Sequence, residues 1–168
     1  MFGASGNDAI SLLESDHRKV EGLFEKVKAN EDGNNTATFR KIKEELDLHS
    51  HVEEQVFYPH LLQKGDKELQ KIVREGLEEH GVVKDLLAEL DGLTGDSATF
   101  RAKLTVLIEN VEHHVEEEEG EMFDMARDQI PADMLERLGS LITAEKERVR
   151  KSGGTGAPRP RATAARRG

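Results

Sequence analysis

The chain lacks cysteine and tryptophan, and only 4% of its 168 residues are aromatic. Without cysteine, a protein forms no disulfide, thiolate zinc site or iron–sulfur cluster, and it has no cysteine nucleophile. No apolar run approaches the roughly 20 residues that cross a membrane. The N-terminus also lacks the basic segment and apolar run of a secretory signal. We therefore expect a cytoplasmic protein with no membrane partner.

The net charge of −10 is unevenly distributed along the chain. Residues 151–168 carry five cations and no acid, so residues 1–150 carry a charge of −15. Such an acidic body argues against nucleic-acid binding by the folded domain. The segment 152–168 consists mainly of Gly, Pro, Ala and Arg, which cannot bury enough surface to fold, and it is expected to be a disordered basic tail.

Apolar residues recur at alternating steps of three and four in four long segments, which is the spacing of one face of an α-helix. Loops rich in Gly, Asn and Asp separate these segments, and short loops favour antiparallel neighbours. The sequence therefore predicts an all-α fold, with an up-down-up-down antiparallel four-helix bundle over residues 1–128. A short fifth helix is expected within 129–151, packed on the bundle or extending it, with Leu135, Leu138, Leu141 and Ile142 on its apolar side.

Each of the four apolar stripes carries a histidine where a core leucine would be expected. These histidines are His17, His49, His80 and His114. Glu53 and Glu118 each follow a histidine by four residues, which places each pair one turn apart on the same helix face. Buried charged groups are costly unless they are paired or bound to a metal ion. Six such groups aimed at one core predict a metal site.

The spacing of these residues also repeats, because 32 residues separate His17 from His49 and 34 separate His80 from His114. Each half of the chain supplies one lone histidine and one His/Glu pair, so two similar helical hairpins are expected to face one another. Imidazole and carboxylate ligands suit iron, manganese or zinc. Six ligands are too many for one tetrahedral zinc ion, and they match two octahedral ions bridged by the glutamates.

The ordered set of motifs resembles the hemerythrin-like, or HHE cation-binding, domain over roughly residues 8–128. The matching elements are Asp16-His17, His49-x-x-x-Glu53-Glu54, Glu79-His80 and His114-x-x-x-Glu118-Glu119. This resemblance implies two non-haem iron ions per chain, joined by an oxide or hydroxide. It assigns His17, His49 and bridging Glu53 to one iron ion. It assigns His80, His114 and bridging Glu118 to the other, and it leaves open which histidine serves which ion.

The chain departs from the oxygen-carrying members of this family at two positions. Lys84 stands where the carriers have a fifth histidine, and Glu118 stands one residue before the position of their aspartate. The lost nitrogen ligand disfavours a simple oxygen store. We therefore expect a small-molecule partner such as O₂, H₂O₂ or nitric oxide, and peroxide decomposition in oxidative or nitrosative stress defence. The alternative is a non-enzymatic protein that binds or senses O₂, nitric oxide or iron.

The roles of several neighbouring residues stay open at this stage. Glu54 and Glu119 either support the ligands, face solvent or ligate the metal themselves. Tyr58 is either a core or surface aromatic or a residue with a redox or hydrogen-bonding role near iron. His113 replaces His114 as a ligand if the helix is rotated. Lys84 either reaches solvent or pairs with a bound oxyanion. The two remaining histidines, which lie off the stripes, are expected on the surface; they are His51 and His60.

Overall fold

The computed structural model describes residues 6–153, and every regular element within this range is helical. The predicted disordered tail therefore lies outside the described residues, apart from its first two positions. The elements are α1 (Ala9–Lys28), α2 (Thr36–Val52), η1 (Glu53–Phe57), α3 (Tyr58–Lys64), α4 (Lys67–Asp91), α5 (Ala98–Glu117), η2 (Glu118–Met122), α6 (Phe123–Gln129) and α7 (Ala132–Lys151). No helix of the described part is long and apolar enough to cross a membrane.

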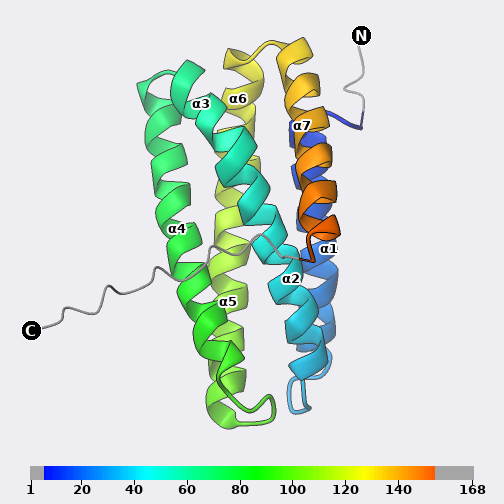
Figure 1. Ribbon diagram of the computed structural model, residues 1–168. Coiled ribbons are helices and arrows are strands. Elements are labelled where there is room, and N and C mark those ends of the chain that lie inside the picture. Colours follow the sequence, from blue (N-terminus) through cyan, green and yellow to red (C-terminus); the bar gives the residue numbers. More distant parts are fainter. Residues whose placement is uncertain (1–5, 154–168) are drawn as a thin grey trace, which may run out of the picture.

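The predicted four-helix bundle is confirmed (Figure 1). Two of its four rods are α1 and α4, and the other two are compound. Helix α2 continues through η1 into α3, and α5 continues through η2 into α6. Side-chain caps fix where three helices begin, because Asp8, Asp66 and Ser97 each accept a hydrogen bond from a backbone N–H three residues later.

The segments η1 and η2 are π-helical turns that begin at Glu53 and Glu118. The backbone carbonyls of these two residues accept hydrogen bonds from the N–H groups five residues later, of Tyr58 and Phe123. Each turn adds one residue to the helix and so changes the face that the following residues present. Pro59 does not end this compound helix. Pro59 lies in the first turn of α3, where a missing N–H is tolerated.

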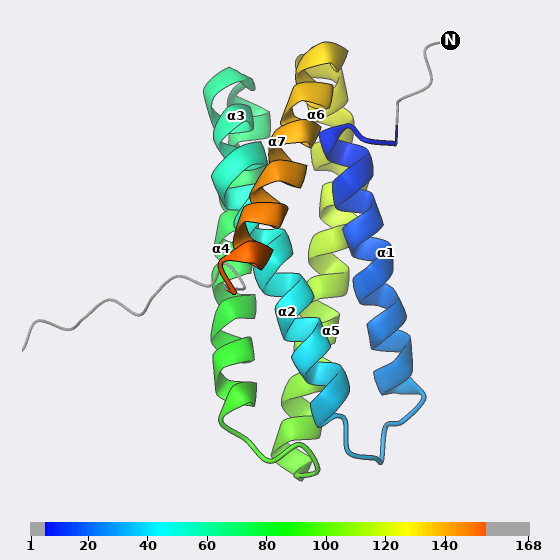
Figure 2. The ribbon, with the colours of Figure 1, turned by 45° about the vertical axis from the view of Figure 1, so that its right-hand side comes forward.

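The predicted fifth helix is confirmed within residues 129–151, and it is longer than expected. Helix α7 has 20 residues, as many as α1. It packs along α1 and α2 beside one half of the bundle (Figure 2). Its buried side includes Leu138, Ile142 and Val149, whereas Leu141 is 51% exposed and does not belong to the apolar side. One residue before Ile142, Leu141 points about 100° away around the helix.

Two apolar clusters fill the bundle, one on each side of the predicted metal site. Along α1, Leu13 belongs to the first cluster and Val20 to the second, and His17 lies between them. The first cluster also includes residues from the inner face of α7. The site is therefore a polar layer between two apolar clusters.

Candidate metal centre

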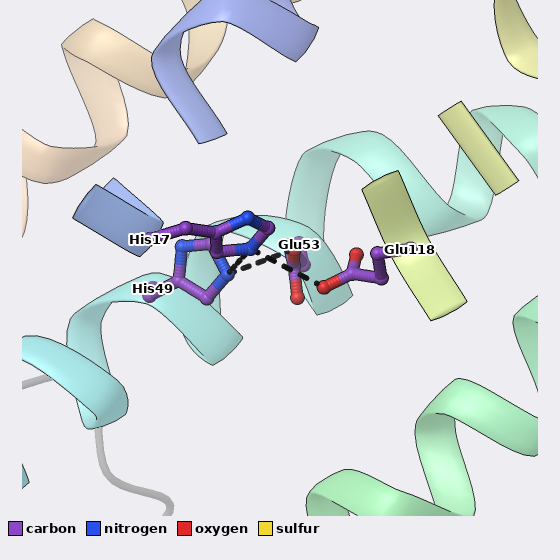
Figure 3. A group of neighbouring side chains, drawn as sticks. All are labelled: His17, His49, Glu53 and Glu118. Carbon is purple, nitrogen blue, oxygen red and sulfur yellow. Dashed lines mark hydrogen bonds and ion pairs between the residues drawn. The ribbon is translucent and has the colours of Figure 1, made fainter. Parts of the chain in front are cut away.

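All six predicted site residues lie in this layer. They are His17 from α1, His49 from α2, Glu53 from η1, His80 from α4, His114 from α5 and Glu118 from η2. All six are buried, and the two glutamates have no exposed surface. Figure 3 shows the side chains of His17, His49, Glu53 and Glu118 directed toward one another from their separate elements.

The four histidines form two pairs, one from each half of the chain. His17 Nε2 lies 3.2 Å from His49 Nε2, and His80 Nε2 lies 3.1 Å from His114 Nε2. Within each of two groups, ligand atoms of all members lie within 4.8 Å of one another. The groups are His17, His49, Glu53 and Glu118, and Glu53, His80 and His114. The internal repeat thus has a direct geometric counterpart in two facing imidazole pairs.

The two carboxylates lie between these pairs. Glu53 Oε1 is 3.0 Å from His49 Nε2, and Glu53 Oε2 is 3.0 Å from His80 Nε2. Glu118 Oε1 lies 2.9 Å from His114 Nε2 and 3.5 Å from His17 Nε2. Each carboxylate therefore contacts a histidine from both halves, which is the arrangement that a bridging ligand requires.

Three carboxylate oxygens of this layer are buried without a hydrogen-bond partner. Both oxygens of Glu53 and Oε1 of Glu118 approach imidazole nitrogens, but none of these contacts has hydrogen-bond geometry. A buried, unpaired carboxylate costs several kcal/mol as an order of magnitude. Cations between the imidazoles and the carboxylates would remove this cost. Four nitrogen ligands and two carboxylates fit a di-iron site by number and by type.

A second set of carboxylates faces the outer nitrogens of the histidines. Three of these acids lie within hydrogen-bond distance of an Nδ1 atom, Asp16 at 3.1 Å from His49, Glu79 at 2.7 Å from His114 and Glu119 at 3.0 Å from His17. The fourth, Glu54, lies 3.5 Å from Nδ1 of His80.

Because an ionised carboxylate only accepts hydrogen bonds, the three shorter contacts place a proton on Nδ1 of His17, His49 and His114 and leave Nε2 of each for a metal ion. Of the two acids whose role was open, Glu119 lies within hydrogen-bond distance of a histidine, whereas Glu54 lies beside His80 without a hydrogen bond to it. Sequence reasoning did not assign Asp16 and Glu79 a role. A usable signal was present, because each acid directly precedes a striped histidine.

The metal-free site favours protonated histidines. Burial opposes the charge of His49, but the carboxylates of Glu53 and Asp16 outweigh burial and raise the pKa of His49 to about 10. The same balance, dominated by Glu118, raises the pKa of His114 well above its usual value. Burial likewise disfavours the charge of Asp16, yet His49 and Lys146 lower its pKa to about 2. Protons thus hold the positions that metal ions would take.

Comparison with known proteins agrees with this geometry. The model of the hemerythrin HHE cation binding domain matches residues 8–126. The chain belongs to this family. A hemerythrin HHE cation binding domain-containing protein from Mycobacterium kansasii, known from a crystal structure, superposes with a TM-score of 0.73 at 27% identity, over 86% of this chain and 88% of that one.

Two curated relatives are longer than this chain. An uncharacterized hemerythrin-like protein from Schizosaccharomyces pombe is 30% identical over 105 residues, which cover 62% of this chain and 52% of the relative. A protein from a Nostoc species, named a DNA nickase, is 25% identical over 142 residues, or 83% of this chain and 39% of the relative. The match thus spans about half or less of each curated relative.

Two of the candidate residues, His113 and Lys84, do not belong to the six-residue layer. The side chain of His113 is 66% exposed and pairs with Glu117, so His114 is the histidine that faces the interior. The side chain of Lys84 is 31% exposed and forms an ion pair instead of extending freely into solvent. Its Nζ lies 2.7 Å from both carboxylate oxygens of Glu54. The position of the carriers' fifth histidine is therefore occupied by an ion pair.

Two further side chains, those of Tyr58 and His51, are less exposed than surface residues would be. Tyr58 is buried, and its hydroxyl donates a hydrogen bond to Glu118 Oε2 at 3.0 Å. His51 was expected on the surface, but its side chain is only 15% exposed and lies 2.7 Å from Glu145 of α7. The stripe pattern treats four helices only, so it could not anticipate that the fifth helix covers His51.

A cavity of about 30 Å³ adjoins the four histidines of the candidate metal centre. Its remaining wall is mainly aliphatic, with Lys84, Ser50 and Asp16 as polar members. The aliphatic lining consists of Val20, Leu46, Val83, Leu87, Val111 and Val115. A cavity of this size holds about one or two water-sized molecules. The centre therefore has room beside it for a very small ligand and for nothing larger.

Proposed function

We propose that the protein holds two iron ions and decomposes hydrogen peroxide. In this proposal, His17, His49 and Glu53 ligate one ion, and His80, His114 and Glu118 ligate the other, with both glutamates bridging. The observation that carries the proposal is the pair of fully buried glutamates between two imidazole pairs, because three of their four carboxylate oxygens lack a hydrogen-bond partner. We assign the iron-binding domain to residues 1–128 and regard 129–151 as a helix packed on it.

In this proposal, the residues around the two iron ions have separate roles. Two bound iron ions would supply the two-electron redox chemistry that peroxide decomposition requires. The carboxylates at Nδ1 hold the imidazole rings in place, as outer partners of metal ligands commonly do. The mainly aliphatic cavity has room for a molecule of peroxide size beside the histidines. The position of the fifth histidine holds Lys84, which pairs with Glu54, so it supplies no fifth imidazole. The lack of this ligand supports turnover over reversible oxygen storage.

The alternative is non-enzymatic binding or sensing of O₂, nitric oxide or iron. The same mainly aliphatic cavity supports this function equally well, since a diatomic ligand fits the space. The two functions differ in one measurable respect. An enzyme evolves oxygen from peroxide, whereas a sensor gives a stable ligand-bound optical spectrum without turnover.

The test combines elemental analysis, the optical spectrum and oxygen evolution from H₂O₂ by iron-loaded protein. We expect two irons per chain, charge-transfer bands of a bridged di-iron centre, and oxygen evolution well above that of His49→Ala. Adjacent histidines provide a matched control, because His114→Ala should lose iron while His113→Ala keeps it.

Two results would count against the proposal. Oxygen evolution no faster than that of His49→Ala would remove the enzymatic function. Zinc in place of iron in the purified protein would remove the redox chemistry altogether.

A further inference from the structure

Helix α7 reaches the candidate metal centre through Lys146. The Nζ atom of Lys146 lies 2.6 Å from both carboxylate oxygens of Asp16, and Asp16 Oδ2 lies 3.1 Å from His49 Nδ1. The side chains of Lys146 and Asp16 are only 14% and 10% exposed. An unbroken chain of polar contacts therefore connects the fifth helix to a histidine of the inner cluster. Lys146 lies beyond residues 8–126, the part matched by the family model.

The position of Lys146 is fixed by its own helix. The preceding residue, Glu145, lies 2.7 Å from His51 of α2, while Lys146 contacts Asp16 of α1. Consecutive residues of α7 thus engage the two helices that supply His17 and His49, and Figure 2 shows α7 running beside both helices. The buried side chains of Ile142 and Val149, one turn or less from this pair, dock the helix there.

In the other half of the bundle, a cation contacts Glu54 beside His80, but among the described residues none contacts Glu79, the counterpart of Asp16. By the internal repeat, Glu79 is to His114 what Asp16 is to His49, and its carboxylate lies 2.7 Å from His114 Nδ1. Within residues 6–153, the ion pairs include no lysine or arginine on Glu79. The fold therefore does not require a cation at this position in order to orient a histidine. Lys146 makes the two imidazole pairs unequal.

We propose that Lys146 is a positioning residue for the metal centre: it fixes the Asp16 carboxylate, which holds His49 with Nε2 turned toward the metal. This inference rests on the proposed function, since the orientation matters only when an ion is bound. An aspartate held by two partners cannot rotate toward solvent, and the imidazole that donates to it keeps its plane. Removing the ammonium frees both side chains, so the ion bound by His17 and His49 should leave faster.

The experiment measures loss of Fe²⁺ from the fully loaded full-length chain to an excess of a ferrous chelator without oxygen. Loss of an outer partner of a metal ligand typically costs ~10–100-fold in affinity, and Lys146 acts one contact further out, so we expect Lys146→Met to speed release of one of the two ions by about tenfold. Release of the second ion should be unchanged. Lys146→Arg, which retains the cation, should restore slow release.

Two further variants separate positioning from a general effect on α7. Arg148→Met removes an exposed cation that contacts only Glu145 on the same helix, and it should leave both release rates unchanged. In an Asp16→Asn background, Lys146→Met should add no further effect, because both residues act on His49 in series.

The outcomes of this experiment are distinct. Equal release rates for Lys146→Met and Arg148→Met overturn the inference while the wild-type chain still holds two irons. Additive effects of Lys146→Met and Asp16→Asn also overturn it, because Lys146 would then act by another route. A wild-type chain that takes up no iron overturns the proposed function, and the inference falls with it.

Discussion

Glu53 joins the two halves of the bundle, because its Oε2 lies 3.0 Å from His80 Nε2 although the two residues belong to different hairpins. The other oxygen of the same carboxylate lies 3.0 Å from His49 Nε2. Each histidine belongs to one imidazole pair, whereas Glu53 contacts both. Loss of this one side chain should therefore affect both metal positions, and loss of a histidine should affect mainly one.

We predict that Glu53→Gln, which keeps the shape of the side chain and removes its charge, weakens the binding of both iron ions. An inner ligand should cost at least the ~100-fold that marks the upper end for outer partners. His17→Ala should weaken mainly one ion. Iron per chain, measured by elemental analysis at limiting iron, distinguishes the two patterns. Retention of both ions by Glu53→Gln at wild-type affinity would contradict the bridging role.

A second prediction concerns Tyr58, whose hydroxyl donates to Glu118 Oε2. Burial and the nearby charge of Glu118 raise the pKa of Tyr58 well above its usual value, so it remains a donor at neutral pH. Tyr58→Phe leaves a fully buried carboxylate oxygen without its donor. The free energy of unfolding of the metal-free protein should fall by ~1–3 kcal/mol, as urea denaturation can measure. An unchanged free energy of unfolding would show that the hydrogen bond contributes nothing.

The third prediction concerns the pH dependence of stability. In the metal-free protein, the pKa of His49 rises from 6.5 to about 10 on folding. Its contribution is therefore complete below pH 6.5 and is lost as the pH rises through 10. The melting temperature of metal-free protein should fall across this interval. Iron replaces these protons, so loaded protein should show a weaker dependence, and iron uptake should release protons into a weakly buffered solution.

His113→Ala serves as the control for this pH dependence, because His113 is exposed and lies outside the cluster. This variant should keep the fall in melting temperature, whereas His49→Ala should reduce it. A metal-free protein whose melting temperature stays constant from pH 6.5 to 10 would argue against protons held on the buried histidines.

The fourth prediction compares two helical glycines. A side chain at Gly139 of α7 would collide with the carbonyl oxygen of Asn7 at the start of α1, whereas a side chain at Gly22 of α1 would meet nothing within 4 Å. Gly139→Ala should therefore destabilise the protein by ~1–3 kcal/mol through overpacking. Gly22→Ala should stabilise it by up to ~1 kcal/mol through helix propensity. Chemical denaturation of both variants measures the difference, and equal effects would mean that α7 does not dock closely against α1.

Local periodicity was sufficient to predict the four bundle helices and the burial of their histidines. A step of three or four residues keeps side chains on one helix face whatever the helix packs against. The stripe that contains His114 and omits His113 therefore predicted the correct side of α5. The same rule fails for Leu141, because the width of the buried face of α7 depends on how the helix docks.

The composition and spacing of the chain by themselves determined an all-helical fold and the inward position of His17, His49, Glu53, His80, His114 and Glu118, because both follow from the regular geometry of a helix. Only the tertiary structure decided which nitrogen meets which carboxylate. The ion pair of Lys84 with Glu54 and the contact of Lys146 with Asp16 depend on distances between separate helices. No repeat along one helix carries that information.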